Sequence, residues 1–302
     1  MLDYPALQAL ATVVQTGSFE KAAAALHVTP SAISQRVKLL EERLGTVLVA
    51  RGTPCTATET GAWLCRHVEH VGMLEKELRD RLPGLADPAD TRRDVTLHIA
   101  TNADSLGIWF LKAAAPFARE AGYLLDVVVD DEEHTAEWLR RGRVLAAVTA
   151  LGKPVQGCRM MPLGTLRYHA TASPAFLARH FPAGVNARSL AAAPSLTFNQ
   201  KDRMQGQWLR QVLGREIACP THWLPSTQAF VEACALGMGW AMNPEPLTRA
   251  LLREGRLVEL IPDTPLDVPL FWQVNRLAAA RIAGLTREVA AAARQALRGK
   301  DA

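Results

Sequence analysis

A run of four carboxylates, Asp130 to Glu133, is the segment of this 302-residue chain with the clearest chemical character. It follows the apolar stretch 124–130, which has the pattern of a buried strand. Carboxylates at the end of such a strand would crowd the sheet edge where α/β proteins bind ligands, and a cationic ligand would relieve their repulsion. Asp130 and Asp131 lie nearest the strand and are the better candidates. Glu132 and Glu133 can equally be the acidic first turn of the next helix, and an ordinary solvated surface is the competing interpretation of the whole run.

Three polar residues, Asn102, Asp104 and Ser105, lie between the preceding predicted strand (95–100) and a helix. Amides exposed at that point could bind a carboxylate, although simple N-capping explains these residue types equally well. Lysine or arginine, with its carboxylate near Ser105 and its cationic end near Asp130 or Asp131, would satisfy both groups. Further residues that could bond the same ligand, or merely cap helices, are Asn199, Asp202, Ser226 and Thr227.

The elements around these residues alternate in the order of an α/β fold. Strands are expected at 95–100, 124–130 and 145–149, with helices ending near residues 121 and 142 between them, which predicts a parallel βαβαβ unit. A second α/β unit is expected over 166–262. The strand 270–274 and the helix 282–297 would return to the first sheet, so two lobes with a ligand cleft between them are predicted.

The third predicted helix carries the other set of polar residues that could do chemistry. Thr29 can cap this helix and Pro30 suits its first position. Helical spacing turns Ile33, Val37, Leu40 and Leu44 inward and Ser31, Gln35, Lys38 and Glu42 outward. Gln35 can pair with adenine, while serine and lysine can hold bases or phosphates. We therefore expect DNA contacts from Ser18, Thr29, Pro30, Ser31, Ser34, Gln35, Arg36, Lys38 and Arg51.

The context of this helix favours DNA reading over an ordinary solvated helix face. A first helix over 5–15 ends at Gly17, Ser18 caps a second helix, and a tight turn leads to the Pro30 helix. Gly45 ends that helix, and the segment 47–57 has the pattern of a small β-wing. The predicted N-terminal fold is thus an all-α winged helix-turn-helix, whose third helix would enter the major groove.

A long helix is predicted from Thr58 to Leu82. Its apolar residues recur at spacings of three and four among many charges: Leu64, Val68, Val71, Leu74, Leu78 and Leu82. A core helix of one domain is possible, but the helix leads into Pro83-Gly84 and a polar segment typical of an interdomain linker. We therefore expect a dimerisation helix.

Composition agrees with a soluble binding protein and offers little for catalysis. The formal net charge is +4, and the five scattered cysteines indicate free thiols in a reducing cytoplasm. His134 and His169 lack partners in the sequence, and Gly237-Met238-Gly239 is too short for a phosphate loop. We expect no enzyme, cofactor, metal site or membrane contact. A transport solute-binding protein would share the two lobes, but it would need an export signal and would lack the DNA-binding head.

The segments GSFEKAAAALHVTPSAISQRVKLLEERLGTVLVAR and ATETG closely resemble the N-terminal signature of LysR-type transcriptional regulators. The resemblance implies a homodimer or homotetramer, double-stranded operator DNA and RNA polymerase as partners, and a small-molecule effector bound by a two-lobed domain. The segments TNADSLGIWFL and STQAFVEACALGMG are similar to the ArgP/LysG branch, whose members regulate the export of basic amino acids. Two departures concern DNA contact: Thr29-Pro30-Ser31 replaces the commoner Gln-Pro-Ala, and Val49-Ala50 replaces an aromatic residue. A different metabolite as effector is the alternative.

These arguments predict the following division of the chain: a winged helix-turn-helix over 1–57, a linker and dimerisation helix over 58–82, and a hinge over 83–93. Effector lobe I is expected over 94–165 and 268–302, and lobe II over 166–267.

Overall fold

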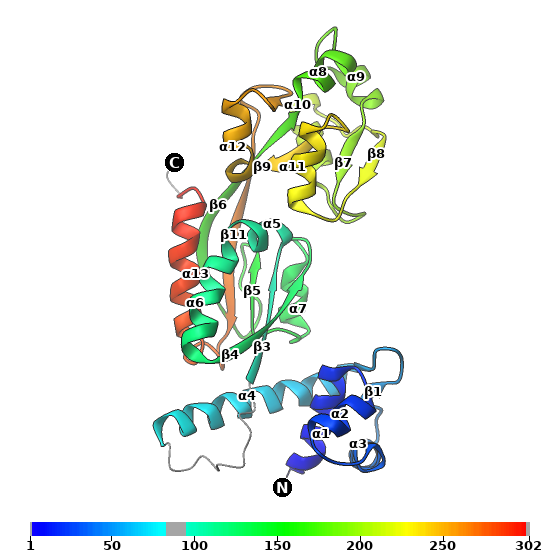
Figure 1. Cartoon of the computed structure of the whole chain (residues 1–302), viewed down its shortest axis with the longest axis vertical. Coiled ribbons are helices and arrows are strands. Elements are labelled where there is room, and N and C mark those ends of the chain that lie inside the picture. The colour runs from blue at the N-terminus through cyan, green and yellow to red at the C-terminus, as the bar shows by residue number, and fades with distance from the viewer. Residues whose placement is uncertain (1, 83–94, 300–302) are drawn as a thin grey trace.

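The computed structural model describes residues 2–82 and 95–299. It consists of a helical head, a long helix and two α/β lobes (Figure 1). The predicted hinge 83–93 and residue 94 lie outside the described residues. Within the described part, no helix is long and apolar enough to cross a membrane.

The head contains three helices and a two-stranded wing, as predicted. The helices are α1 (Tyr4–Thr16), α2 (Phe19–Ala25) and α3 (Pro30–Leu44), and the wing pairs β1 (Val49–Ala50) with β2 (Thr56–Ala57). Gly17 and Gly45 adopt the left-handed conformation that ends α1 and α3. Ile33, Val37 and Leu40 are buried, but Leu44 is 47% exposed, which corrects the expected core arc. Since α3 ends there and the chain turns at Gly45, Leu48 fills the core in its place.

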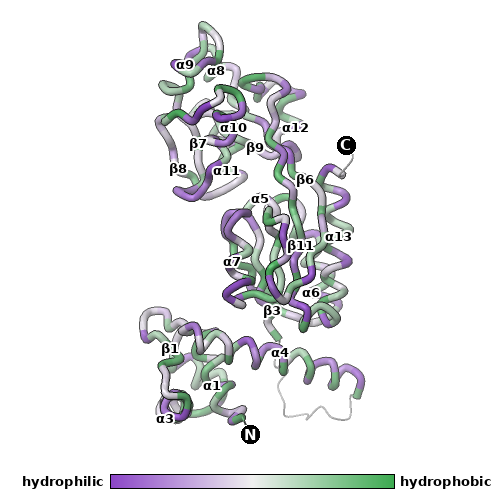
Figure 2. The backbone as a smooth tube through the Cα atoms, turned by 180° about the vertical axis from the view of Figure 1, so that it is seen from behind, coloured by the Kyte–Doolittle hydropathy of each residue, from purple (hydrophilic) through white to green (hydrophobic). Residues whose placement is uncertain are grey.

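The long helix α4 (Glu59–Arg81) contacts both the head and the first lobe. Leu64 and Val68 pack against the head core, whereas Met73 is fully buried in the effector core with Leu97 and Ile99. In Figure 2, purple and green segments alternate along α4. The helix therefore packs against the head on one side and against the effector core on another. On a third side Leu74, Leu78 and Leu82 remain about half exposed.

Lobe I contains the predicted parallel unit. Its strands β3 (Val95–Thr101), β4 (Tyr123–Val129) and β5 (Ala146–Thr149) are parallel in the order β4-β3-β5. The helical segments are α5 (Ala103–Ser105), the π-helix η2 (Leu106–Phe110), α6 (Leu111–Ala121), α7 (Thr135–Arg140) and α13 (Ala283–Ala296). Figure 1 shows α6 and α13 side by side on one face of this sheet and α7 on the other.

Two strands pass between the lobes. β11 (Leu266–Asn275) pairs antiparallel along its whole length with residues 158–168 of β6 (Cys158–Ala172), and β11 also pairs with β5. The register shifts between Leu270 and Phe271, at the level of Gly164. One sheet therefore runs through both lobes, and the predicted second α/β unit over 166–262 shares it through β6, β9 and β10.

Lobe II is built around the upper part of these strands. β9 (Ala241–Pro244) and β10 (Val258–Glu259) pair with β6, and β7 (Ser195–Thr197) and β8 (Thr221–Trp223) form a small parallel pair. Its helices are α8 (Pro174–His180), α9 (Ala187–Ala192), α10 (Met204–Leu213), α11 (Thr227–Ala235) and α12 (Glu245–Arg253). Ser226 caps α11, and the first residue of this helix, Thr227, bonds to Asp104, so α11 begins where lobe II meets lobe I.

Candidate functional site: an acidic interlobe cleft and a DNA-reading helix

The N-terminal end of α3 is built by local capping. The Thr29 hydroxyl accepts a hydrogen bond from the Ala32 amide at 3.2 Å and lies 3.0 Å from the Ser31 hydroxyl. Pro30 occupies the first helical position, where no amide is needed. Ser18 likewise caps α2 by accepting from the Lys21 amide at 3.3 Å. The capping roles of Ser18 and Thr29 are therefore observed, while their DNA contacts remain a prediction.

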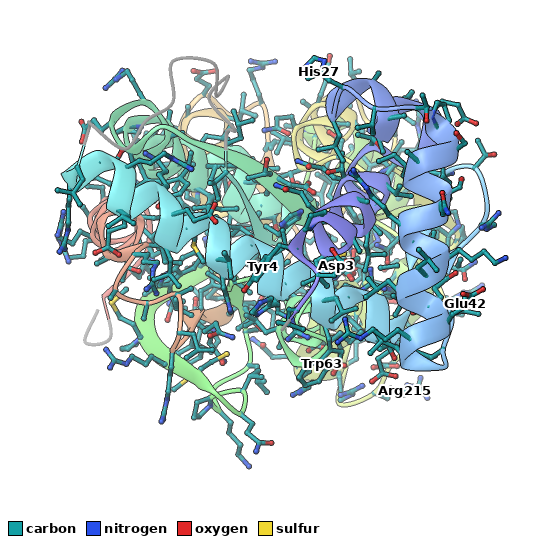
Figure 3. The ribbon with its side chains drawn as sticks, turned by 90° about the horizontal axis from the view of Figure 1, so that it is seen from below. Asp3, Tyr4, His27, Glu42, Trp63 and Arg215 are labelled. Carbon is teal, nitrogen blue, oxygen red and sulfur yellow. The ribbon has the colours of Figure 1, made fainter. Side chains whose placement is uncertain are left out.

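The outward face of α3 is polar and accessible along its length. Ser31, Gln35 and Lys38 are exposed, and Ser34 and Arg36 are partly exposed beside them. Lys38 also lies 3.6 Å from Glu42, one turn further on, in a solvent-exposed pair. Figure 3 views the head from below, where Glu42 points outward from α3. The face is open for base-edge contacts near its N-terminal half.

Arg51 lies in the wing, where its guanidinium stacks 5.2 Å from the centre of the Phe19 ring. Its side chain is exposed, so it can reach a phosphate beside the helix that reads the bases. All nine residues proposed for DNA contact thus belong to one head, on α2, α3 or the wing.

In the effector part, carboxylates from three segments gather where lobe II meets lobe I, close enough for their charges to act on one another. Asp104 comes from α5, Asp131 and Glu132 follow β4, and Asp202 precedes α10. Asp104 accepts hydrogen bonds of 2.5 Å from both the Tyr168 and the Thr227 hydroxyls. Within the described residues these groups form no metal-binding cluster. Their concentration of negative charge suits an organic cation.

Burial and mutual repulsion perturb these carboxyl groups. Burial raises the pKa of Asp104, and it raises the pKa of Asp131 with a further contribution from the charge of Asp202. The pKa of Glu132 is raised well above its usual value by burial and by the charges of Asp131 and Asp104. Tyr168, buried beside Asp104, also has a strongly raised pKa and stays a neutral donor. A bound cation would lower the electrostatic cost of ionising this cluster.

Two polar side chains at the start of the same helical segment lack partners. Asn102 is 2% exposed and Ser105 is fully buried, and neither the Asn102 amide nor the Ser105 hydroxyl has a hydrogen-bond partner among the described residues. Unsatisfied buried polar groups are uncommon and costly. They could bond the carboxylate or amino group of a ligand, the role that the sequence analysis predicts for this segment.

The structure gives Asp130 different partners from those expected. Its carboxylate accepts from the Trp138 indole at 3.0 Å and from Lys201 of lobe II at 3.1 Å. Although burial opposes ionisation, the hydrogen bonds from Trp138, the Asp131 amide and Lys201 lower the pKa of Asp130. Since Asp130 is already paired, it is the weaker partner for a ligand cation. Glu132, which sequence reasoning treated as an alternative helix first turn, forms no salt bridge with a lysine or arginine among the described residues.

The remaining candidates mainly organise the loops of lobe II. Asn199 accepts from the Lys201 amide at 2.7 Å, and Asp202 accepts from the Phe198 and Met204 amides. Ser226 caps α11 by accepting from the Ala229 amide. Only Asp202 also acts on the cluster, through its charge, while Thr227 contacts it directly through Asp104. Tyr168 and Lys201 were missed because their roles depend on the crossing strand and on the approach of the two lobes.

Comparison with known proteins identifies both parts of the chain. Residues 5–62 match the model of a bacterial regulatory helix-turn-helix protein, lysR family, and residues 92–295 match the LysR substrate binding domain. The HTH-type transcriptional regulator LysG of Mycobacterium tuberculosis is 44% identical over 300 residues, covering 99% of this chain and 96% of LysG. The crystal structure of ArgP from the same organism has a TM-score of 0.80 at 43% identity, with 99% and 100% of the two chains covered. Full-length LysG of Corynebacterium glutamicum with the bound effector Arg has a TM-score of 0.71 at 37% identity, covering 98% and 100%.

Proposed function

Since the chain belongs to the LysR family and is a DNA-binding transcriptional regulator, we propose that its effector is a basic amino acid, arginine or lysine, bound between lobes I and II. The observation that carries this proposal is the acidic cluster of Asp104, Asp131, Glu132 and Asp202 beside the unpartnered Asn102 and Ser105. One end of such a site suits a cation and the other suits the α-carboxylate or α-amino group. The arginine bound to the Corynebacterium LysG supports the same ligand class.

The charges also favour a cationic side chain over an aliphatic one. An aliphatic ligand would leave carboxylates with raised pKa values desolvated and without a counter-charge, which is costly. A guanidinium can donate in parallel to two carboxylates, whereas an ammonium acts as a point charge. Both ligands fit the chemistry of the cluster, so lysine and arginine are proposed together.

The rest of the proposal follows from the kind of protein. The head would bind a double-stranded operator as a dimer or tetramer, with α3 in the major groove and Arg51 on the backbone. Effector binding would change transcription through RNA polymerase, in the cytoplasm, at target genes such as that of an amino-acid exporter. Another small metabolite in the same cleft is the alternative effector.

The test is calorimetry of the full-length protein with arginine, lysine, leucine and citrulline. Citrulline replaces the arginine guanidinium with a neutral group of similar shape. We expect binding of arginine or lysine, with citrulline and leucine at least tenfold weaker. Equal binding of citrulline and arginine, or no binding of either basic amino acid at millimolar concentration, would contradict the proposed effector class. DNA binding by the head would be unaffected by that result.

A further inference from the structure

The C-terminal segment after α13 pairs with β6 where this strand passes from lobe I to lobe II. Arg298 forms two backbone hydrogen bonds of 3.0 Å with Thr165 of β6, one in each direction. Its guanidinium donates to both carboxylate oxygens of Glu245, at 2.8 and 3.0 Å. Glu245 is the first residue of α12 in lobe II, while α13, which ends just before Arg298, packs against α6 and η2 of lobe I. One residue thus ties the end of lobe I to the start of a helix in lobe II.

The contact lies at the point where both crossing strands are irregular. Gly164 has φ +128°, and a Cβ at that position would come within 2.6 Å of the Arg298 carbonyl oxygen. The same residue pairs with Leu270, next to which the register of β11 shifts. On the lobe I side of this level β11 pairs with β5, and on the lobe II side β6 pairs with β9. Bending between the lobes is therefore expected at this level, where Arg298 is attached.

The two faces of β6 contact different groups near this level. Tyr168 donates to Asp104 in the cleft, whereas its neighbour Arg167 pairs with Asp267 of β11. Successive side chains of a strand point to opposite faces, so these charged residues lie on the face opposite Tyr168. The Arg298–Glu245 pair lies close to this group, since the charge of Arg298 lowers the pKa of Asp267 and the charge of Glu245 raises the pKa of Arg167. The tie is thus behind the cleft and makes no contact with the proposed ligand residues.

The angle that this tie fixes is the one at which the lobes meet across the cleft. Thr227 donates to Asp104, Lys201 to Asp130 and Gln207 to Glu133, and each of these bonds joins lobe II to lobe I. A ligand entering between the lobes must separate these groups or replace their bonds. A contact that fixes the angle between the lobes, such as the Arg298–Glu245 pair, then changes how readily the lobes close around the ligand.

We propose that Arg298 is a positioning residue for effector binding, which acts through Glu245 to hold lobes I and II at the angle at which Thr227 reaches Asp104 and Lys201 reaches Asp130. This inference rests on the proposed function only for the choice of arginine as the ligand whose binding is measured. The bidentate pairing with Glu245 lowers the pKa of that carboxyl group and raises that of the guanidinium, so both remain charged at neutral pH. The Arg167–Asp267 pair is a matched contrast, because both of its residues lie on the crossing strands and move together.

The first experiment is calorimetric titration of full-length variants with arginine. Arg298→Ala and Glu245→Gln are expected to weaken arginine binding about three- to tenfold, and the exchanged pair Arg298→Glu with Glu245→Arg to recover part of the loss. Asp267→Ala should stay within about twofold of wild type. Wild-type affinity in Arg298→Ala, or the same loss in Arg298→Ala and Asp267→Ala, would overturn the proposal.

The second experiment needs no ligand and so separates this inference from the identity of the effector. Spin labels on non-natural amino acids at the exposed positions of Glu120 in lobe I and Arg179 in lobe II report the interlobe distance. We expect a narrow distance distribution in the wild type and a broader one in Arg298→Ala, with Asp267→Ala like the wild type. If the wild type binds neither arginine nor lysine but the distribution broadens as expected, only the effector class fails. An unchanged distribution in a folded Arg298→Ala protein rejects the positioning role.

Discussion

Lys201 of lobe II lies 3.1 Å from the Asp130 carboxylate of lobe I, so an ion pair already joins the two lobes beside the acidic cluster. Lys201 is about half exposed, and solvent weakens such a pair. The pair nevertheless distinguishes Asp130 from Asp131 and Glu132. Among the described residues, neither Asp131 nor Glu132 forms a salt bridge with a lysine or an arginine.

The first prediction concerns this difference between neighbouring carboxylates. Glu132→Gln and Asp131→Asn should weaken arginine binding about tenfold or more, because a charge-assisted partner contributes about 1.5 to 3 kcal/mol. Asp130→Asn should have a smaller effect, since its charge is already balanced by Lys201. Calorimetry on the three variants measures the order. A larger loss in Asp130→Asn than in Glu132→Gln would mean that Lys201 leaves Asp130 when the ligand binds.

The second prediction is that arginine binding weakens as the pH falls. The pKa values of Glu132 and Asp131 are raised, so these groups take up protons at a pH where ordinary carboxylates are still ionised. Arginine keeps its charge throughout this range, and only the site loses charge. Titrations from pH 8 downward should therefore show falling affinity in the wild type and a flatter profile in Glu132→Gln. Affinity that rises on acidification would mean that the cluster does not receive the cationic end.

The third prediction applies the same shift to the stability of the unliganded protein. A carboxyl group whose folded pKa lies above its unfolded pKa binds more protons when folded, so its ionisation destabilises the fold as the pH rises. Glu132→Gln, which is permanently neutral, should accordingly raise the melting temperature relative to wild type at pH 8. The difference should shrink as the pH falls through the raised pKa of Glu132. Thermal unfolding at several pH values, with Glu133→Gln on the exposed neighbour as control, measures it.

Local patterns were sufficient to predict the head and lobe I. Capping by Ser18 and Thr29 and the left-handed glycines Gly17 and Gly45 depend on neighbours within a few residues, so the sequence contains the whole signal. The three strands of lobe I appear as short apolar runs: β5 is buried throughout and β3 over its second half, whereas the edge strand β4 is only partly buried. The carboxyl edge of these strands then places Asp104 and Asp131 in the cleft.

The remaining features depend on contacts between distant parts of the chain. β6 has 15 residues and serves both lobes, but its sequence does not reveal that Tyr168 reaches Asp104, 64 residues earlier. Lys201 and Asp130 are 71 residues apart and meet only because the lobes approach each other. Leu44 has the spacing of a core residue but lies at the end of α3, where the chain turns away. Periodicity alone cannot indicate where a helix leaves the core.

The fourth prediction concerns base reading by α3. Gln35→Ala removes an exposed side chain that can pair with adenine, so it should weaken operator binding by about 1 to 3 kcal/mol while leaving binding to random DNA nearly unchanged. Arg51→Ala in the wing should weaken both kinds of DNA alike and reduce the salt dependence. Fluorescence anisotropy at two salt concentrations measures both effects. If Gln35→Ala lowers affinity for operator and random DNA equally, Gln35 contacts the backbone instead of a base.

The last prediction assigns the exposed stripe of α4 to a second copy of the chain. Leu74, Leu78 and Leu82 are each about half exposed and follow one another at intervals of four residues, which places them on one face of the helix, whereas Met73 on the adjacent face is buried against lobe I. The sequence also placed Val68 on the dimerisation stripe, but Val68 packs against the head core. A substitution there would therefore disturb the head and is not a suitable test of dimerisation. Leu74→Asp with Leu78→Asp would place unpaired charges in the interface, which is costly, and should convert the oligomer to monomers. Glu75→Ala, at an exposed position between them, should leave the oligomer intact. Sedimentation velocity of both proteins decides the matter, with circular dichroism to show that the variants are folded. An intact oligomer in the double variant would locate the interface elsewhere and leave this stripe without a partner.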